Sequence, residues 1–145
     1  MALQRLGAWL AGVWGGSLLG VGLIGAPAPF ATLATADAGR VVARIFAQEA
    51  YLSLAFAVML YLIARRLARA AAVAGTGSVL GANVLLVLGT LFCTIAGYFA
   101  VQPMLTAARA GEGAFSFGAL HAASMAFFAL KTVLVLVLAW RLGAR

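Results

Sequence analysis

Three ionisable residues lie inside or at the edge of long apolar stretches of this 145-residue chain: Glu49, His121 and Lys131. Such side chains are costly in an apolar environment, so each needs a partner or a function. Glu49 and His121 each lie about one turn inside the expected outer end of their stretch, which predicts a common depth. A carboxylate beside an imidazole can be a simple helix–helix clasp or a site that takes up and releases a proton. The sequence leaves both interpretations open.

Further polar residues are expected near the level of Glu49 and His121. Gln102 follows the third apolar stretch, and Arg44 precedes the second. We predict a polar cluster near the outer face of a membrane, formed by Arg44, Gln48, Glu49, Gln102, His121, Ser124 and Lys131.

Lys131 lies near the middle of the fourth apolar stretch, on the same helical face as His121 and Ser124. We expect no acid at its depth. Thr90, backbone carbonyls, trapped water or loss of its proton would then accommodate it. Snorkelling of the ammonium toward Asn83 and a functional role are both compatible with the sequence.

The elements that must position these residues follow from the composition. Hydrophobic residues make up 66% of the chain, charged residues 9%, and the mean hydropathy is +1.11. These values exclude a soluble globular domain and a disordered chain. Four stretches are long enough to cross a bilayer as helices, at residues 6–26, 46–64, 79–101 and 117–140. We predict an all-α polytopic membrane protein, with residues 1–145 forming a single four-helix transmembrane bundle.

The connecting segments refine this prediction. Pro27 and Pro29 are expected to end the first span, and Pro103 the third, because proline cannot donate a helix hydrogen bond. Residues 37–48 have the pattern of an amphipathic helix at the outer interface that runs into the second span. The first stretch is longer than the apolar part of a signal peptide, so we interpret it as a retained span.

The arginines predict the orientation. One side of a four-span protein receives six of them, whereas the other side receives three, together with Asp37 and Glu112. The six are Arg5, Arg65, Arg66, Arg69, Arg141 and Arg145. By the positive-inside rule both termini are expected in the cytoplasm, in a plasma membrane. The net charge of +7 is therefore interpreted as membrane anchoring, and we expect no nucleic-acid partner.

Small residues at four-residue spacing predict close helix packing. They are Ala8, Gly12, Gly16 and Gly20 in the first span, and Gly89, Cys93 and Gly97 in the third. Whether each ladder packs within one chain or between chains stays open. Cys93 is interpreted as a packing residue, since one cysteine and one histidine do not form a zinc site. We expect no metal and no cofactor.

Several stretches resemble a bacterial family of small integral membrane proteins, the domain-of-unknown-function 4149 family, which is grouped with transmembrane protein 205. They are residues 6–10, 26–30, 44–51, 138–141, and Leu120-His121 with Ser124. The resemblance implies a four-helix membrane protein and supplies no catalytic residues.

Two functions are compatible with these features. The first is a non-enzymatic protein that assembles with itself or with another membrane protein through its small-residue ladders. The alternative is a small transporter or proton-coupled carrier that uses Glu49 and His121, with a substrate that the sequence does not identify. No nucleophile motif or phosphate-binding loop indicates an enzyme.

Overall fold

The computed structural model describes residues 1–144, and within that range the regular structure is entirely helical. The helices are α1 (Ala2–Gly20), α2 (Ala28–Thr32), α3 (Thr35–Val73), α4 (Ala82–Thr94), α5 (Val101–Arg109) and α6 (Phe117–Gly143). Two short π-helical segments, η1 (Val21–Gly25) and η2 (Ile95–Ala100), follow α1 and α4.

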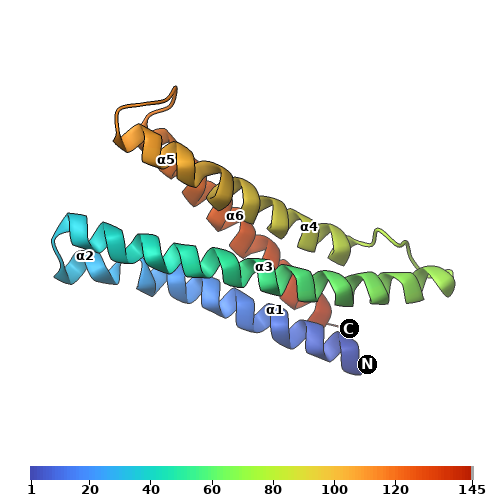
Figure 1. The fold of residues 1–145 in the computed structure, drawn as a ribbon. Helices are drawn as coiled ribbons and strands as arrows, with labels where there is room; N and C mark the ends of the chain where they lie inside the picture. The colour runs from blue at the N-terminus through green and yellow to red at the C-terminus, as the bar shows by residue number, and fades with distance from the viewer. Residues whose placement is uncertain (145) are drawn as a thin grey trace.

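These elements form four long helical runs, at Ala2–Thr32, Thr35–Val73, Ala82–Arg109 and Phe117–Gly143. Each run is long and apolar enough to cross a membrane, which confirms the predicted all-α class with four spans. Successive runs are antiparallel, and both ends of the chain lie at the same end of the molecule (Figure 1). We call this end the terminal end. The opposite end carries α2 and the loop between α5 and α6.

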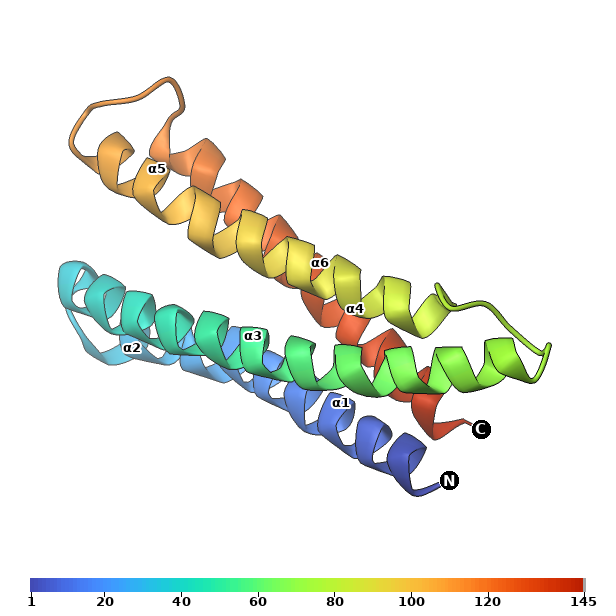
Figure 2. The same cartoon turned by 45° about the vertical axis from the view of Figure 1, so that its right-hand side comes forward.

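The four runs pack as two antiparallel pairs. α1 lies beside α3, whereas the α4–α5 run lies beside α6, and the pairs separate toward α2 and α5 (Figures 1 and 2). α1 also packs against α6, and α3 against α4, so α3 and α6 lie on a diagonal. All four contribute to the main core, formed by Ala11, Trp14, Leu18, Phe56, Ala57, Leu60, Ala64, Val84, Val87, Val135, Leu138 and Leu142.

The second span begins earlier than its hydropathy indicates. α3 has 39 residues, a length of about 58 Å, and its amphipathic first part is continuous with the span itself. Asp37 lies in the first turn, where its carboxylate pairs with Arg40. The expected helix over residues 37–48 is therefore present as the start of α3.

The prediction that prolines end the first and third spans is correct for the first, where regular helix stops before Pro27, and wrong for the third. Beyond the first span the chain turns at residues 26–27 and continues as α2, which contains Pro29, and the third span continues through Pro103 to Arg109. In each case a π-helical segment comes immediately before the proline-containing segment. Pro29 and Pro103 then lie in the first turn of the next helical segment, the part of a helix in which proline is tolerated.

The two predicted small-residue ladders differ in their surroundings: the ladder of the third span faces another helix, whereas most of the ladder of the first span faces open space. In the third span, Gly89 and Gly97 face Leu134 and Phe127 of α6, so this ladder packs within the chain. Cys93 between them is buried. In the first span, Ala8 packs against the core, whereas Gly12, Gly16 and Gly20 have open space where a side chain would begin. Among the glycines of this run that contact other helices are Gly7 and Gly15 of α1 and Gly22 of η1.

We expect the substitution Gly97→Ala to destabilise the protein in detergent by about 1–3 kcal/mol, the usual range for overpacking. The added methyl group would collide with Cβ of Phe127, which belongs to the backbone-proximal part of α6 and cannot move away easily. Thermal unfolding followed by circular dichroism measures the effect.

The matched control is Gly118→Ala, since Gly118 also lies in a helix and has no atom within 4 Å of the added methyl group. Its unfolding temperature should stay the same or rise slightly, because alanine favours helix more than glycine does. Equal losses for both variants would contradict the close contact between η2 and α6.

Candidate functional site

The most polar feature of the interior is an ion pair between two spans. Nζ of Lys131 on α6 lies 2.7 Å from Oε1 of Glu49 on α3. Both residues are buried, with 3% and 7% of their surface exposed. Because α3 and α6 lie on a diagonal, this pair crosses the centre of the helix arrangement.

Ser53 extends the ion pair into a network over three helices. It lies one turn after Glu49 on α3, and its hydroxyl donates a hydrogen bond to the Glu49 carboxylate. The same oxygen accepts hydrogen bonds from Nε1 of Trp14 at 3.0 Å and from Nζ of Lys131 at 3.2 Å. One donated and two accepted bonds are all that a hydroxyl can make. Ser53 is therefore saturated.

Aromatic rings enclose this network. The indole of Trp14 stacks on Phe56 with a centroid distance of 5.8 Å, and Nζ of Lys131 lies 5.2 Å from the ring centroid of Phe128. Trp14 is fully buried, which fixes the direction of its N–H toward Ser53. Within residues 1–144, no buried side-chain nitrogen or oxygen lacks a hydrogen-bond partner. We call Trp14, Glu49, Ser53 and Lys131 the central network.

The expectation that no acid shares the depth of Lys131 is wrong. Glu49 is the fifteenth residue of α3, and Lys131 is the fifteenth residue of α6. Both helices begin at the end opposite the terminal end, so the two residues lie about 21 Å along their helices. The prediction failed because it placed the start of the second span at residue 46, whereas α3 begins at Thr35.

The predicted pairing of Glu49 with His121 is also wrong. His121 precedes Lys131 by ten residues, about 15 Å along α6, and its exposed ring stacks on Phe117 with a centroid distance of 5.8 Å. The cation of Arg109 covers the same Phe117 ring at 4.9 Å. His121 therefore belongs to a surface stack near the loop between α5 and α6.

The other members of the predicted cluster are dispersed. Arg44 and Gln48 are exposed on α3, and Gln102 is half-buried on α5. Ser124 donates a hydrogen bond of 2.8 Å to the backbone carbonyl of Gly97, which joins α6 to η2. Of the seven predicted residues, the structure brings together Glu49 and Lys131.

Sequence reasoning missed two members of the central network. The spacing of Ser53, four residues after Glu49, was a signal for its place on the same helical face. Trp14 carries no comparable signal, since an indole in an apolar span is most simply interpreted as packing. Asn83, the other expected partner of Lys131, instead accepts a hydrogen bond of 3.0 Å from Nε of Arg141 at the terminal end.

The central network is well suited to hold helices together. A paired lysine and carboxylate are neutral overall. Their hydrogen bonds to one another and to Ser53 take the place of the hydrogen bonds to water that these groups would make outside a bilayer. Chemistry would need an accessible reactive atom, whereas Glu49, Ser53 and Lys131 already bind one another. No group of three or more metal-ligating His, Cys, Asp or Glu residues occurs in the described part of the chain.

Comparison with known proteins gives one match. A family model described as "Domain of unknown function (DUF4149)" matches residues 9–114. This range includes Trp14, Glu49 and Ser53, whereas Lys131 lies beyond it. No curated protein and no solved structure matches the chain.

We expect Lys131→Met to destabilise the protein by about 3–5 kcal/mol, because it leaves the Glu49 carboxylate buried without a counterion. The double variant Glu49→Gln with Lys131→Met removes both charges and should recover most of that loss. Chemical unfolding of the single and double variants in the same detergent measures the coupling between the two residues.

Losses that simply add in the double variant would contradict an energetic role for the ion pair. A conservative control is Lys131→Arg, which keeps the positive charge. It should be less destabilising than Lys131→Met if the charge matters more than the shape of the side chain.

Proposed function

The chain belongs to the DUF4149 family of membrane proteins, and we propose that it is a non-enzymatic assembly protein whose first span packs against a span of another protein molecule. The observation that carries this proposal is the open face of α1. Gly12, Gly16 and Gly20 form one stripe with no atom within 4 Å of where their side chains would begin. Small residues at this spacing let two helix backbones approach closely in lipid.

The same helix shows what its glycines do when they have a partner. On the buried face, Gly15 of α1 and Gly22 of η1 lie against Leu136 and Phe128 of α6, at 3.0 and 3.1 Å from the expected Cβ positions. Gly12 and Gly16 place glycines in the same way on the exposed face of α1. A second helix can therefore pack on the exposed face as α6 packs on the buried one.

The central network supports an assembly role over a carrier. The Glu49 carboxylate already binds Lys131 and Ser53, and His121 lies about 15 Å away along the bundle. Proton-coupled transport would need the Glu49 carboxylate to take up a proton from the solution, which would leave the Lys131 ammonium buried without a counterion. The interior is built to keep the four spans in one arrangement.

The charges support an inner-membrane location with cytoplasmic termini. Five of the described arginines lie at the terminal end: Arg5, Arg65, Arg66, Arg69 and Arg141. Arg145 lies outside the described residues. Arg40, Arg44 and Arg109 lie at the opposite end, where Asp37 and Glu112 offset part of their charge. By the positive-inside rule the terminal end faces the cytoplasm.

We expect Gly16→Ile to weaken association of the first span by at least about tenfold, because a branched side chain would separate the two helix backbones. Association is measured by energy transfer between labelled copies in lipid vesicles, and by co-purification with membrane proteins from the native host. The thermal stability of the variant chain should stay unchanged, since the added side chain meets open space.

The matched control is Ala129→Ile, which adds a similar side chain to an exposed position of α6. It should leave association unchanged. If Gly16→Ile and Ala129→Ile both associate as the original chain does, the open glycine face is not an interface and the proposal fails.

A further inference from the structure

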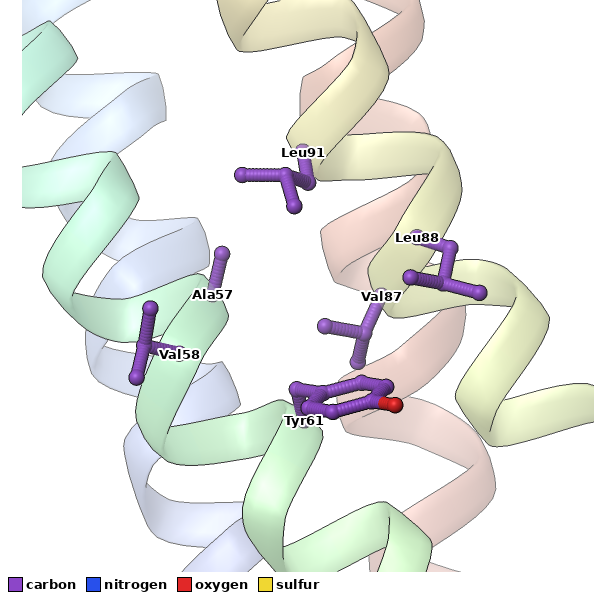
Figure 3. Close-up of a pocket in the computed structure, with 6 residues that line it drawn as sticks. All are labelled: Ala57, Val58, Tyr61, Val87, Leu88 and Leu91. Carbon is purple, nitrogen blue, oxygen red and sulfur yellow. The ribbon is translucent and has the colours of Figure 1, made fainter.

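An apolar groove lies between α3 and α4 on the surface that faces lipid. Its volume is about 270 Å³, and it is lined by Ala57, Val58, Tyr61, Val87, Leu88 and Leu91 (Figure 3). Ala57 and Val87 are buried and form the floor, whereas Val58 and Leu88 are 56% and 39% exposed and form the rim. A cavity of about 150 Å³ can hold a benzene molecule, so this groove can hold part of an acyl chain.

One end of the groove leads to a row of arginines. Figure 3 shows the ring of Tyr61 reaching from α3 toward α4 across that end. Arg65 and Arg69 follow Tyr61 by one and two turns on α3, and the guanidinium of Arg65 lies 6.0 Å from the centroid of the Tyr61 ring. The apolar floor is thus continuous with exposed positive charge, the arrangement that suits a molecule with an apolar tail and an anionic head.

The charge of these arginines is not balanced by an acidic side chain of the chain itself. The sequence contains three acids. Asp37 pairs with Arg40, Glu49 pairs with Lys131, and Glu112 lies in the loop between α5 and α6 at the opposite end. No acidic side chain of the chain therefore serves as a counterion for Arg65 or Arg69.

We infer that this groove is a binding site for one anionic phospholipid, with an acyl chain between α3 and α4 and the phosphate at Arg65 and Arg69. The groove suits an acyl chain, since its lining is apolar. The arginines select an anionic head, because guanidinium groups form paired hydrogen bonds with phosphate. This site is separate from the open glycine face of α1 and does not depend on the proposed assembly role.

The first experiment measures lipid binding by native mass spectrometry of the full chain in detergent. Phosphatidylglycerol and phosphatidylcholine with identical acyl chains are the two probes. We expect one phosphatidylglycerol per chain to be retained, with an apparent affinity at least about fivefold above that of phosphatidylcholine. Equal retention of both lipids would overturn the inference.

Charge and position are separated by comparing two neighbouring arginines. Arg65→Gln should lower the affinity for phosphatidylglycerol about fivefold. Arg66→Gln removes the same charge at the same level, but from a position rotated about 100° away on α3, and it should have a smaller effect. Equal effects would indicate general attraction to anionic lipid and overturn the assigned site.

The groove itself is tested by filling it. Leu88→Trp places a large ring over the groove, whereas Leu85→Trp makes the same change on an exposed face of α4 that does not line it. We expect Leu88→Trp alone to weaken retention of phosphatidylglycerol. If instead it lowers association between protein molecules and leaves lipid retention unchanged, the groove holds a partner helix and the inference is overturned.

Discussion

Glu49 provides the buried ammonium of Lys131 with a counterion, and this ion pair connects the two halves of the structure. Glu49 and Lys131 lie on diagonal helices, so their pairing draws the α1–α3 pair and the α4–α6 pair together at one level. Ser53 and Trp14 bring α1 into the same interaction. The apolar surface of the helices does not provide such a link, because lipid tails are as apolar as leucine side chains. Polar contacts and close glycine packing therefore determine which helix faces meet.

The glycines determine where the helices can approach one another closely. Gly89 and Gly97 allow the third span to approach α6, and Gly7, Gly15 and Gly22 allow the first span to contact α3 and α6. Ser124 adds a hydrogen bond to the Gly97 carbonyl at the same contact. Gly12, Gly16 and Gly20 are also glycines at close spacing, but no other helix of the chain packs against them. The contrast between these two sets is the basis for the proposed assembly role.

The sequence was sufficient to predict the helical class and the four spans, because an excess of apolar residues in runs of about 20 has few other structural outcomes. It was insufficient for the pairing of Glu49. Hydropathy places the beginning of a span at its first apolar residues, whereas α3 is stabilised as a helix from Thr35 onward. That difference of eleven residues moved Glu49 away from His121 and to the level of Lys131. The place of Trp14 depends on packing between distant helices, which local patterns do not encode.

The two π-helical segments affect how a helical wheel for this chain should be drawn. η1 and η2 each hold more residues per turn than an α-helix, so a projection at 3.6 residues per turn loses its phase after residue 25 and again after residue 100. The assignment of residues to helix faces therefore has to begin anew at Ala26 and at Val101.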